Sequence, residues 1–276
     1  MLKKIYMLAT AMIMSLSLLH AQENEGLKVM SYNIRLGSAQ DGTNSWSLRY
    51  LATEEMLKDQ KPDVLGVQEA LEYQVLFIED MCGYESVGVG RENGKNEGEH
   101  MSIFWNKKTV SMLKWGTFWL SETPKKPSKG WDAECFRTAT WALMKDKKTG
   151  NKFYFVNTHL DHKGTEAQKN GLKLIMDKIA EINPEGLPMV LTGDFNIEPS
   201  NPILADIDAS MQNVRKIAEK TDDHATYNGW GKSSTKIDYI YVSGFSSCPE
   251  YQTVTKRYAD RKFVSDHYPI CARLIF

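Results

Sequence analysis

Five short polar clusters in this chain stand at the ends of stretches that read as strands. They are Ser31-Tyr32-Asn33, Gln68-Glu69, Thr158-His159, Gly193-Asp194-Phe195-Asn196 and Ser265-Asp266-His267. Apolar runs rich in β-branched residues precede most of them, at 27–30, 64–67, 153–156 and 189–191. Such a run predicts a buried strand, whose last residue can present its side chain to a pocket. The clusters therefore predict one site assembled from distant parts of the chain.

The chain has 276 residues, 42% of them hydrophobic and 25% charged, which is typical of a globular protein with a sizeable core. A basic start, an apolar stretch over 5–19 and a small residue at Ala21 predict a signal peptide over residues 1–21. A membrane anchor is the alternative, but the stretch is short and polar residues follow it. We therefore expect one domain over residues 22–276, exported to the periplasm or the medium.

Loss of the two lysines in the signal peptide takes the formal net charge from −1 to −3. Proteins that grip long nucleic acids without sequence preference usually carry a basic excess, because phosphate contacts dominate that affinity. The charge thus favours a small phosphate ester, a phosphoinositide or a lipid headgroup over long DNA. The four cysteines have no metal-binding spacing, and their pairing cannot be read from the sequence.

Strand-like and helix-like stretches alternate along the chain. Strands are predicted at 27–34, 64–68, 85–90, 101–105, 139–144, 152–158, 188–193, 237–243 and 268–275, and helices at 47–59, 71–80, 165–182 and 202–211. Two strand–helix–strand stretches around a β-rich middle favour sheets packed face to face with helices outside. Segment 121–132 is either a rim of the site or a solvated loop. Segment 112–120 is either a strand or a membrane-contacting loop.

The residues at the strand ends suit phosphate-ester hydrolysis. Mg²⁺ would take one or two protein carboxylates and keep several waters. Glu69 is the natural direct ligand, and Asn33 could orient it or bind a metal-bound water. Asp194 could hold or deprotonate the attacking water, with Asn196 donating to a phosphate oxygen. Taken alone, an acidic residue after a strand is more often merely solvated.

His159 and His267 could donate hydrogen bonds to the oxygens where negative charge gathers. A histidine in that role needs its second nitrogen held by an acceptor. Asp238 lies in an apolar run, where a carboxylate is costly unless it is paired, so we expect an Asp238–His267 pair. Either histidine alone could equally be structural.

Six motifs in order resemble the endonuclease/exonuclease/phosphatase superfamily. They are Tyr32-Asn33-Ile34-Arg35, Gln68-Glu69, Thr158-His159-Leu160, Gly193-Asp194-Phe195-Asn196, Ile237-Asp238-Tyr239-Ile240 and Ser265-Asp266-His267-Tyr268-Pro269. The match runs from about Leu27 to the C-terminus. The resemblance implies an α/β fold, a four-layer α/β/β/α sandwich of two mainly antiparallel sheets with the site at one edge.

The resemblance also implies residue roles, with Mg²⁺ as cofactor and Mn²⁺ as the alternative ion. It makes Glu69 the main metal ligand with Asn33 beside it, and places Asp266 near the metal. Asp194 aligns or deprotonates the nucleophilic water. The remaining catalytic residues that it implies are His159, Asn196, Asp238 and His267.

Four further residues are candidates for substrate binding. Arg137 lies in a segment that looks like the bacterial secreted branch of the superfamily, and His162, Trp119 and Trp230 could line the pocket. The competing interpretations are a surface ion pair for Arg137, a solvated loop position for His162 and core packing for the tryptophans.

The sequence thus predicts a metal-dependent phosphohydrolase that cleaves a phosphomonoester or phosphodiester with an activated water. An exported nuclease acting on DNA or RNA is the alternative, because this architecture serves several substrates. A catalytically inactive surface binding protein is the alternative of another class, and the filled acid–base positions argue against it. We expect a monomer whose partner is its phosphate-ester substrate.

Overall fold

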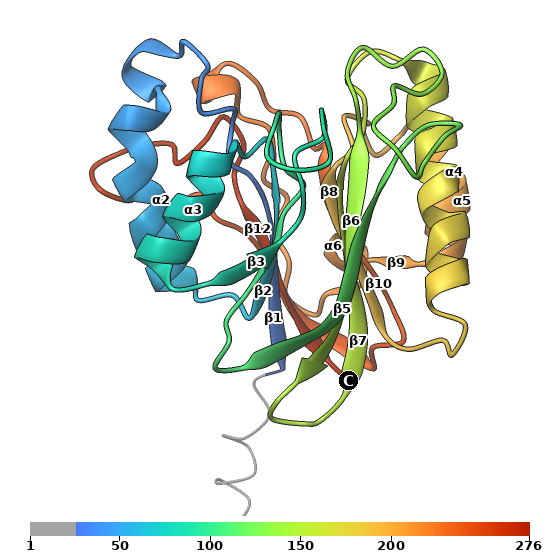
Figure 1. Cartoon of the computed structure of the whole chain (residues 1–276). Helices are drawn as coiled ribbons and strands as arrows, with labels where there is room; N and C mark the ends of the chain where they lie inside the picture. Colours follow the sequence, from blue (N-terminus) through green and yellow to red (C-terminus); the bar gives the residue numbers. More distant parts are fainter. Residues whose placement is uncertain (1–25) are drawn as a thin grey trace, which may run out of the picture.

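The computed structural model describes residues 26–276, so the predicted signal peptide lies outside the described residues. Two six-stranded sheets pack face to face (Figure 1). The first consists, in spatial order, of β11 (Ser247–Thr253), β12 (Ile270–Ile275), β1 (Leu27–Asn33), β2 (Val64–Gln68), β4 (Ile103–Trp105) and β3 (Glu85–Val87). The second consists of β5 (Val110–Trp119), β6 (Thr138–Asp146), β7 (Lys152–His159), β8 (Met189–Asp194), β10 (Asp238–Ser243) and β9 (Gln212–Asn213).

Helices cover the outer face of each sheet. Helices α2 (Trp46–Gln60) and α3 (Glu72–Cys82) lie on the first sheet, and α4 (Thr165–Ile182) and α5 (Ala205–Ser210) on the second (Figure 1). The short elements are η1 (Gly42–Asn44), η2 (Pro202–Leu204), α6 (Val214–Ile217) and η3 (Gly229–Gly231). In the described sheets β1 and β2 are parallel, as are β7 and β8, and the other neighbouring strands are antiparallel. The predicted four-layer α/β/β/α sandwich is confirmed.

The central strands are apolar on both faces because each face is covered. In β1, Val29 points into the core between the sheets and Met30 into the core beneath α2 and α3. In β8, Val190 likewise points into the core between the sheets, and Leu191 points into the core that α4 covers. This double burial explains the continuous apolar runs from which these strands are predicted.

The edges of the sheets were predicted only in part. Segment 112–120 forms a strand, the first of its two alternatives, and all but its last residue lies in β5, an edge strand with a register shift between Met112 and Lys114 and an exposed Trp115 that together obscure its pattern. Strand β11 escaped, because it is short of apolar residues and contains Pro249. Strand β3 ends at Val87, ahead of Gly88, whose φ is 141°. Within residues 26–276, no helix is long and apolar enough to cross a membrane.

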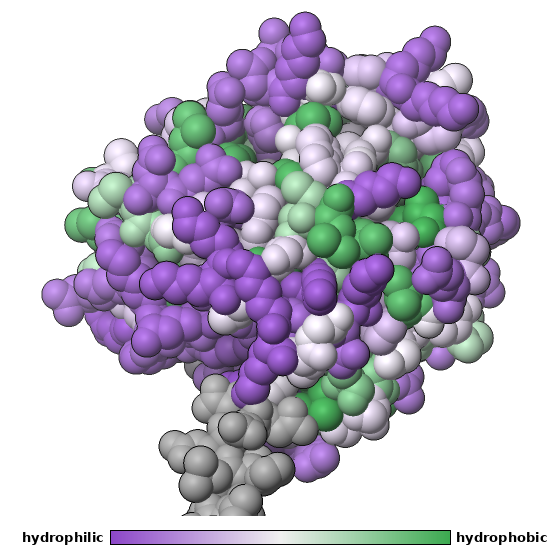
Figure 2. Space-filling model, turned by 60° about the horizontal axis from the view of Figure 1, so that its bottom comes forward, coloured by the Kyte–Doolittle hydropathy of each residue, from purple (hydrophilic) through white to green (hydrophobic). Residues whose placement is uncertain are grey.

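The C-terminal ends of β1, β2, β7 and β8 lie at one end of the sandwich, the upper end in Figure 1. Figure 2 shows the molecule with the opposite end turned forward, and that surface is largely hydrophilic with small, scattered apolar patches. The fold thus gathers the polar clusters at one end of the two central pairs of strands.

Candidate active site

The second sheet aligns three of the predicted residues across neighbouring strands. The parallel pairing of β7 with β8 places His159 beside Asp194, and the antiparallel pairing of β8 with β10 places Asp238 beside Asp194. In the first sheet, the last residue of β1, Asn33, is paired with Gln68, directly before Glu69. Strand register therefore brings residues from five segments of the chain to one edge.

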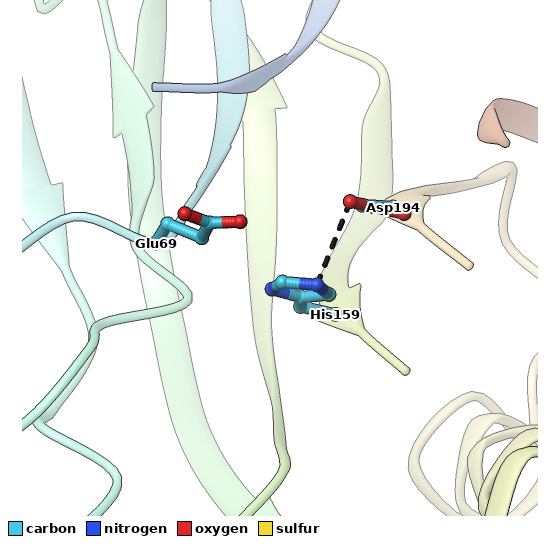
Figure 3. Close-up of side chains that lie close together, drawn as sticks. All are labelled: Glu69, His159 and Asp194. Carbon is cyan, nitrogen blue, oxygen red and sulfur yellow. Dashed lines mark ion pairs between the residues drawn. The ribbon is translucent and has the colours of Figure 1, made fainter. Parts of the chain in front are cut away.

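Glu69 and Asn196 turn the chain sharply where their strands end. Their φ angles are 65° and 52°, a left-handed backbone that costs a residue with a side chain on the order of 1–3 kcal/mol. Local hydrogen bonds hold both turns. The Leu36 N–H donates to Glu69 Oε2 at 2.8 Å, and the Asn196 N–H donates to Asp194 Oδ1 at 2.9 Å. Figure 3 shows the Glu69 carboxylate directed toward His159 and Asp194.

Glu69, His159 and Asp194 form an acidic centre in which ligand atoms of all three lie within 4.8 Å of one another. Asn33 joins the two carboxylates, because its Nδ2 donates to Glu69 Oε1 at 2.9 Å and to Asp194 Oδ2 at 3.0 Å. In this arrangement Asn33 orients both carboxylates, while its own oxygen accepts the Arg35 N–H.

The acidic centre crowds carboxylates together in a buried place. Burial raises the pKa of Asp194 to about 7, and the nearby Asp238 and Glu69 add to the rise against the opposing effect of His267. Crowded carboxylate oxygens suit a hard divalent cation such as Mg²⁺. Glu69 and Asp194 therefore fit the metal that the sequence predicts. Asp266 belongs to neither of the candidate metal clusters found among the described residues; its Oδ2 lies 3.6 Å from Arg35 Nε.

His267 and Asp238 are paired, with 2.8 Å between His267 Nδ1 and Asp238 Oδ2. Burial alone lowers the pKa of His267, but the carboxylates of Asp238 and Asp194 outweigh it and raise the pKa to about 10. His267 is thus an imidazolium at neutral pH, and its Nε2 lies 3.6 Å from Asp194 Oδ2.

His159 is the opposite case. Burial, followed by the positive charges of Arg137 and Arg91, holds the pKa of His159 well below its usual value, so the ring is neutral. Asn196 Nδ2 lies 3.0 Å from His159 Nε2. The two histidines therefore approach Asp194 in different charge states.

Glu99 and Arg91 are site residues that the sequence analysis missed. Glu99 Oε2 lies 4.0 Å from His159 Nδ1, an atom without a hydrogen-bond partner within residues 26–276. Arg91 Nη1 donates to the same Glu99 oxygen at 2.6 Å. They lie there because β4 runs antiparallel to β2, so residues just before β4 lie at the edge where β2 ends.

Arg137 is buried and does not form the surface ion pair considered for it. Its Nε donates to Asp161 Oδ2 at 3.2 Å, and its Nη2 donates to Nδ1 of the exposed His162 ring at 3.0 Å. Trp119 is buried, and its indole N–H donates to the Arg91 carbonyl at 2.7 Å, so it supports the segment that carries Glu99.

We term three half-buried rings, Tyr227, Trp230 and Phe263, the aromatic edge. The Tyr227 ring centroid lies 4.9 Å from that of His267. Trp230 adopts a φ of 60° and lies edge-on to Phe263 with 6.4 Å between centroids. Left-handed backbone at a bulky residue is uncommon and clusters at functional sites.

Comparison with known proteins gives consistent matches over almost the whole described chain. The model of the Endonuclease/Exonuclease/phosphatase family matches residues 30–267. The structure of a mannosyl-6-phosphatase from Bacteroides thetaiotaomicron is similar with a TM-score of 0.85 and 33% identity, covering 91% of this chain and 100% of that one. An endonuclease/exonuclease/phosphatase from Bacteroides vulgatus matches with a TM-score of 0.85 and 35% identity over 90% and 98% of the two chains. Nocturnin from Xenopus laevis is 23% identical over 81% of this chain and 63% of its own length.

Proposed function

The chain belongs to the endonuclease/exonuclease/phosphatase family, and from that premise we propose that it is a Mg²⁺-dependent phosphohydrolase that removes the phosphate of a sugar phosphomonoester. The observation that carries the proposal is the meeting of Glu69 and Asp194 with a charged His267 and a neutral His159. Export to the periplasm or the medium is part of the same proposal and rests on the sequence of residues 1–21.

Each group in the site has a definite task in this reaction. Glu69 and Asp194 would hold the ion, which when bound polarises the phosphate and a water molecule. Asp194, a buried carboxylate between His159 and His267, orients the attacking water and accepts its proton. The His267 imidazolium donates to a non-bridging phosphate oxygen, where charge grows in the transition state.

His159 and Asn196 contact the phosphoryl group from the other side of Asp194. The neutral His159 ring can exchange a proton, and the Asn196 amide is a donor. Arg137 and His162 provide a further basic contact for the phosphate. Asp161 uses the Arg137 Nε–H, so the guanidinium retains donors for a terminal phosphate oxygen.

A sugar monoester is favoured by three independent features. The structure with 33% identity is a mannosyl-6-phosphatase, whereas this chain has a formal net charge of only −1 and lacks the basic excess of a protein that grips long DNA. In the aromatic edge, the Tyr227 ring offers an apolar face beside His267, where the leaving group of a bound ester would lie, and Trp230 packs against Phe263.

The test is a substrate panel with residues 22–276. Mannose 6-phosphate, glucose 6-phosphate, p-nitrophenyl phosphate, bis-p-nitrophenyl phosphate, plasmid DNA and RNA are each assayed with Mg²⁺, Mn²⁺ and EDTA. Asp194→Asn is compared with Asp177→Asn, which removes an exposed carboxylate on α4 that pairs with Lys173 on the surface.

We expect turnover of sugar monoesters that EDTA abolishes, that Asp194→Asn lowers by about 10³-fold and that Asp177→Asn leaves unchanged. Full activity of Asp194→Asn would overturn the mechanism. Cleavage of DNA or RNA without release of phosphate from sugar esters would replace the proposed substrate with a nucleic acid.

A further inference from the structure

Three fully buried polar side chains lie between the two sheets, one layer below the acidic centre. They are Gln68 on β2, Asn157 on β7 and Thr192 on β8, each 0% exposed. The core between the sheets is otherwise built from residues such as Val64, Phe155 and Val190. A polar group costs free energy there unless it is hydrogen-bonded, so the partners of these side chains define what the layer does.

Asn157 links the two sheets with all of its hydrogen-bonding capacity. Its Oδ1 accepts from Gln68 Nε2 at 2.6 Å and from Thr192 Oγ1 at 3.1 Å. Its Nδ2 donates to the carbonyls of Val67 at 2.8 Å and Ser102 at 3.0 Å. Strand β7 of the second sheet is thereby tied to β2 and to the segment entering β4 of the first, and Thr192 of β8 holds the Asn157 amide oxygen from within the second sheet.

The other hydrogen bonds of these side chains stay within one sheet. Gln68 Nε2 reaches Ser31 Oγ at 3.1 Å and the Gly66 carbonyl at 3.3 Å, and Thr192 Oγ1 reaches the Val156 carbonyl at 3.3 Å. Gln68 Oε1 is the one polar atom of these three side chains without a partner among the described residues. We call the connected set of Gln68, Asn157 and Thr192 the inter-sheet bridge.

The positions of the bridge residues in the chain relate them to the active site one by one. Gln68 directly precedes Glu69, while Asn157 and Thr192 stand two residues before His159 and Asp194. Side chains two apart on a strand share a face and lie roughly 7 Å apart along it. The bridge therefore lies directly beneath His159 and Asp194 on their strands, and next to Glu69 in the chain.

Gly66 shows how closely the sheets approach at this layer. A Cβ at Gly66 would lie 2.3 Å from Thr192 Oγ1 and 2.5 Å from Asn157 Oδ1. The polar side chains thus fill the whole space opposite β2, and the bond lengths within the bridge fix the separation of the strands.

We propose that the inter-sheet bridge is a positioning device, which fixes Glu69 of one sheet relative to His159 and Asp194 of the other and thereby sets the affinity of the acidic centre for a divalent cation. This inference rests on the proposed function for the role of the cation. Its physical basis is that the metal ligands come from different sheets, so their spacing depends on what joins the sheets beneath them. Partners one step removed from a metal ligand commonly change affinity by about 10–100-fold when they are lost.

The test uses Thr192→Val, which keeps the shape of the side chain and removes the hydroxyl, with Thr192→Ser as the variant that restores it. The matched control is Thr140→Val. Thr192 Oγ1 bonds within the second sheet, to Asn157 Oδ1 at 3.1 Å and to the Val156 carbonyl at 3.3 Å, so it holds the amide that crosses to the first sheet. Thr140 is also buried in the second sheet, but its hydroxyl bonds to Thr117 at 2.9 Å, which is not part of the bridge. Binding of Mn²⁺ to the substrate-free protein is followed by electron paramagnetic resonance of the free ion, together with thermal unfolding.

We expect Thr192→Val to weaken Mn²⁺ binding by about tenfold, and Thr192→Ser and Thr140→Val to stay within about twofold of the parent. Gln68→Met, which keeps the chain length and removes the donor to Asn157, should weaken binding in the same direction. Equal Mn²⁺ affinity in the parent, Thr192→Val and Gln68→Met would overturn the proposal, as would an equal loss in Thr140→Val.

The two proposals fail in different ways. A parent protein that binds Mn²⁺ but hydrolyses no phosphate ester would overturn the proposed function alone, because the affinities of the variants would still decide the role of the bridge. A parent that binds no Mn²⁺ would overturn both.

Discussion

Replacement of Asp238 by Asn isolates the charge that holds His267 as an imidazolium. The variant keeps the shape of the side chain and removes the carboxylate that lies 2.8 Å from His267 Nδ1. Both side chains are almost fully buried, so solvent does little to weaken their interaction. Among the groups that raise the pKa of His267, Asp238 comes first and Asp194 second.

The size of the effect follows from the pKa. A rise from the ordinary value of 6.5 to about 10 corresponds to roughly 5 kcal/mol in favour of the imidazolium, which is what remains after burial has opposed the nearby carboxylates. Loss of Asp238 should therefore move the alkaline limb of kcat/KM to lower pH by about 1–2 units. At pH 8 most of His267 stays protonated in both proteins, so the difference in rate grows with pH and should reach about 3–25-fold at pH 9.5, where the variant has lost the charged donor to the phosphoryl group. A bound cation lowers the pKa of His267 in both proteins, so the shift between them is the quantity to measure.

Stability gives a second readout of the same pair. The pKa of His267 is raised in the folded protein, so the pair stabilises the fold fully below pH 6.5 and loses this contribution as the pH rises toward 10. The free energy of unfolding of the parent should fall between pH 7 and pH 9.5 by more than that of Asp238→Asn. Asp208→Asn is the control. It removes a carboxylate of α5 that accepts a hydrogen bond from Tyr241, a residue on the same strand as Asp238. An alkaline limb that stays in place, with a rate within about threefold of the parent, would refute the reasoning.

Three further substitutions test separate parts of the site. Glu69→Gln should weaken Mn²⁺ binding by on the order of 100-fold, measured on the substrate-free protein, and unchanged binding would remove Glu69 as a ligand. Glu99→Gln removes the carboxylate facing His159 Nδ1, and it should lower kcat by about 10–100-fold with little change in KM; a change in KM alone would contradict this role. Trp230→Ala should raise KM for mannose 6-phosphate by about 3–10-fold and leave glycerol phosphate unaffected, whereas Trp115→Ala, at an exposed ring on β5, should change neither.

Most of the residues that the structure brings together were predictable from the sequence, because they share one rule. Asn33, His159 and Asp194 are the last residues of buried strands, Glu69 follows one directly, and Asp238 begins one. An apolar run marks such a strand, and parallel neighbours end at the same edge, so the run and its terminal residue together locate the site.

The site residues that the sequence did not predict are not marked by an apolar run. Glu99 precedes a three-residue strand inside a polar loop, so no long apolar run marks its position, and only the antiparallel pairing of β4 with β2 brings it to His159. Tyr227 reaches His267 through an isolated bridge outside the named strands. Contacts of this kind depend on sheet order and loop path, which the periodicity of a single sequence does not encode.

The left-handed residues show why the site and the stability of the fold are connected. Asn adopts a positive φ more readily than Glu. The conformation of Asn196 is therefore a common one, while that of Glu69 needs stabilising contacts. That support comes from the Leu36 N–H and the Asn33 amide, both of which donate to the Glu69 carboxylate. The same two bonds orient this carboxylate for a cation. The backbone strain at Glu69 is therefore balanced by the contacts that prepare the metal site, and a substitution that frees the carboxylate loses both at once.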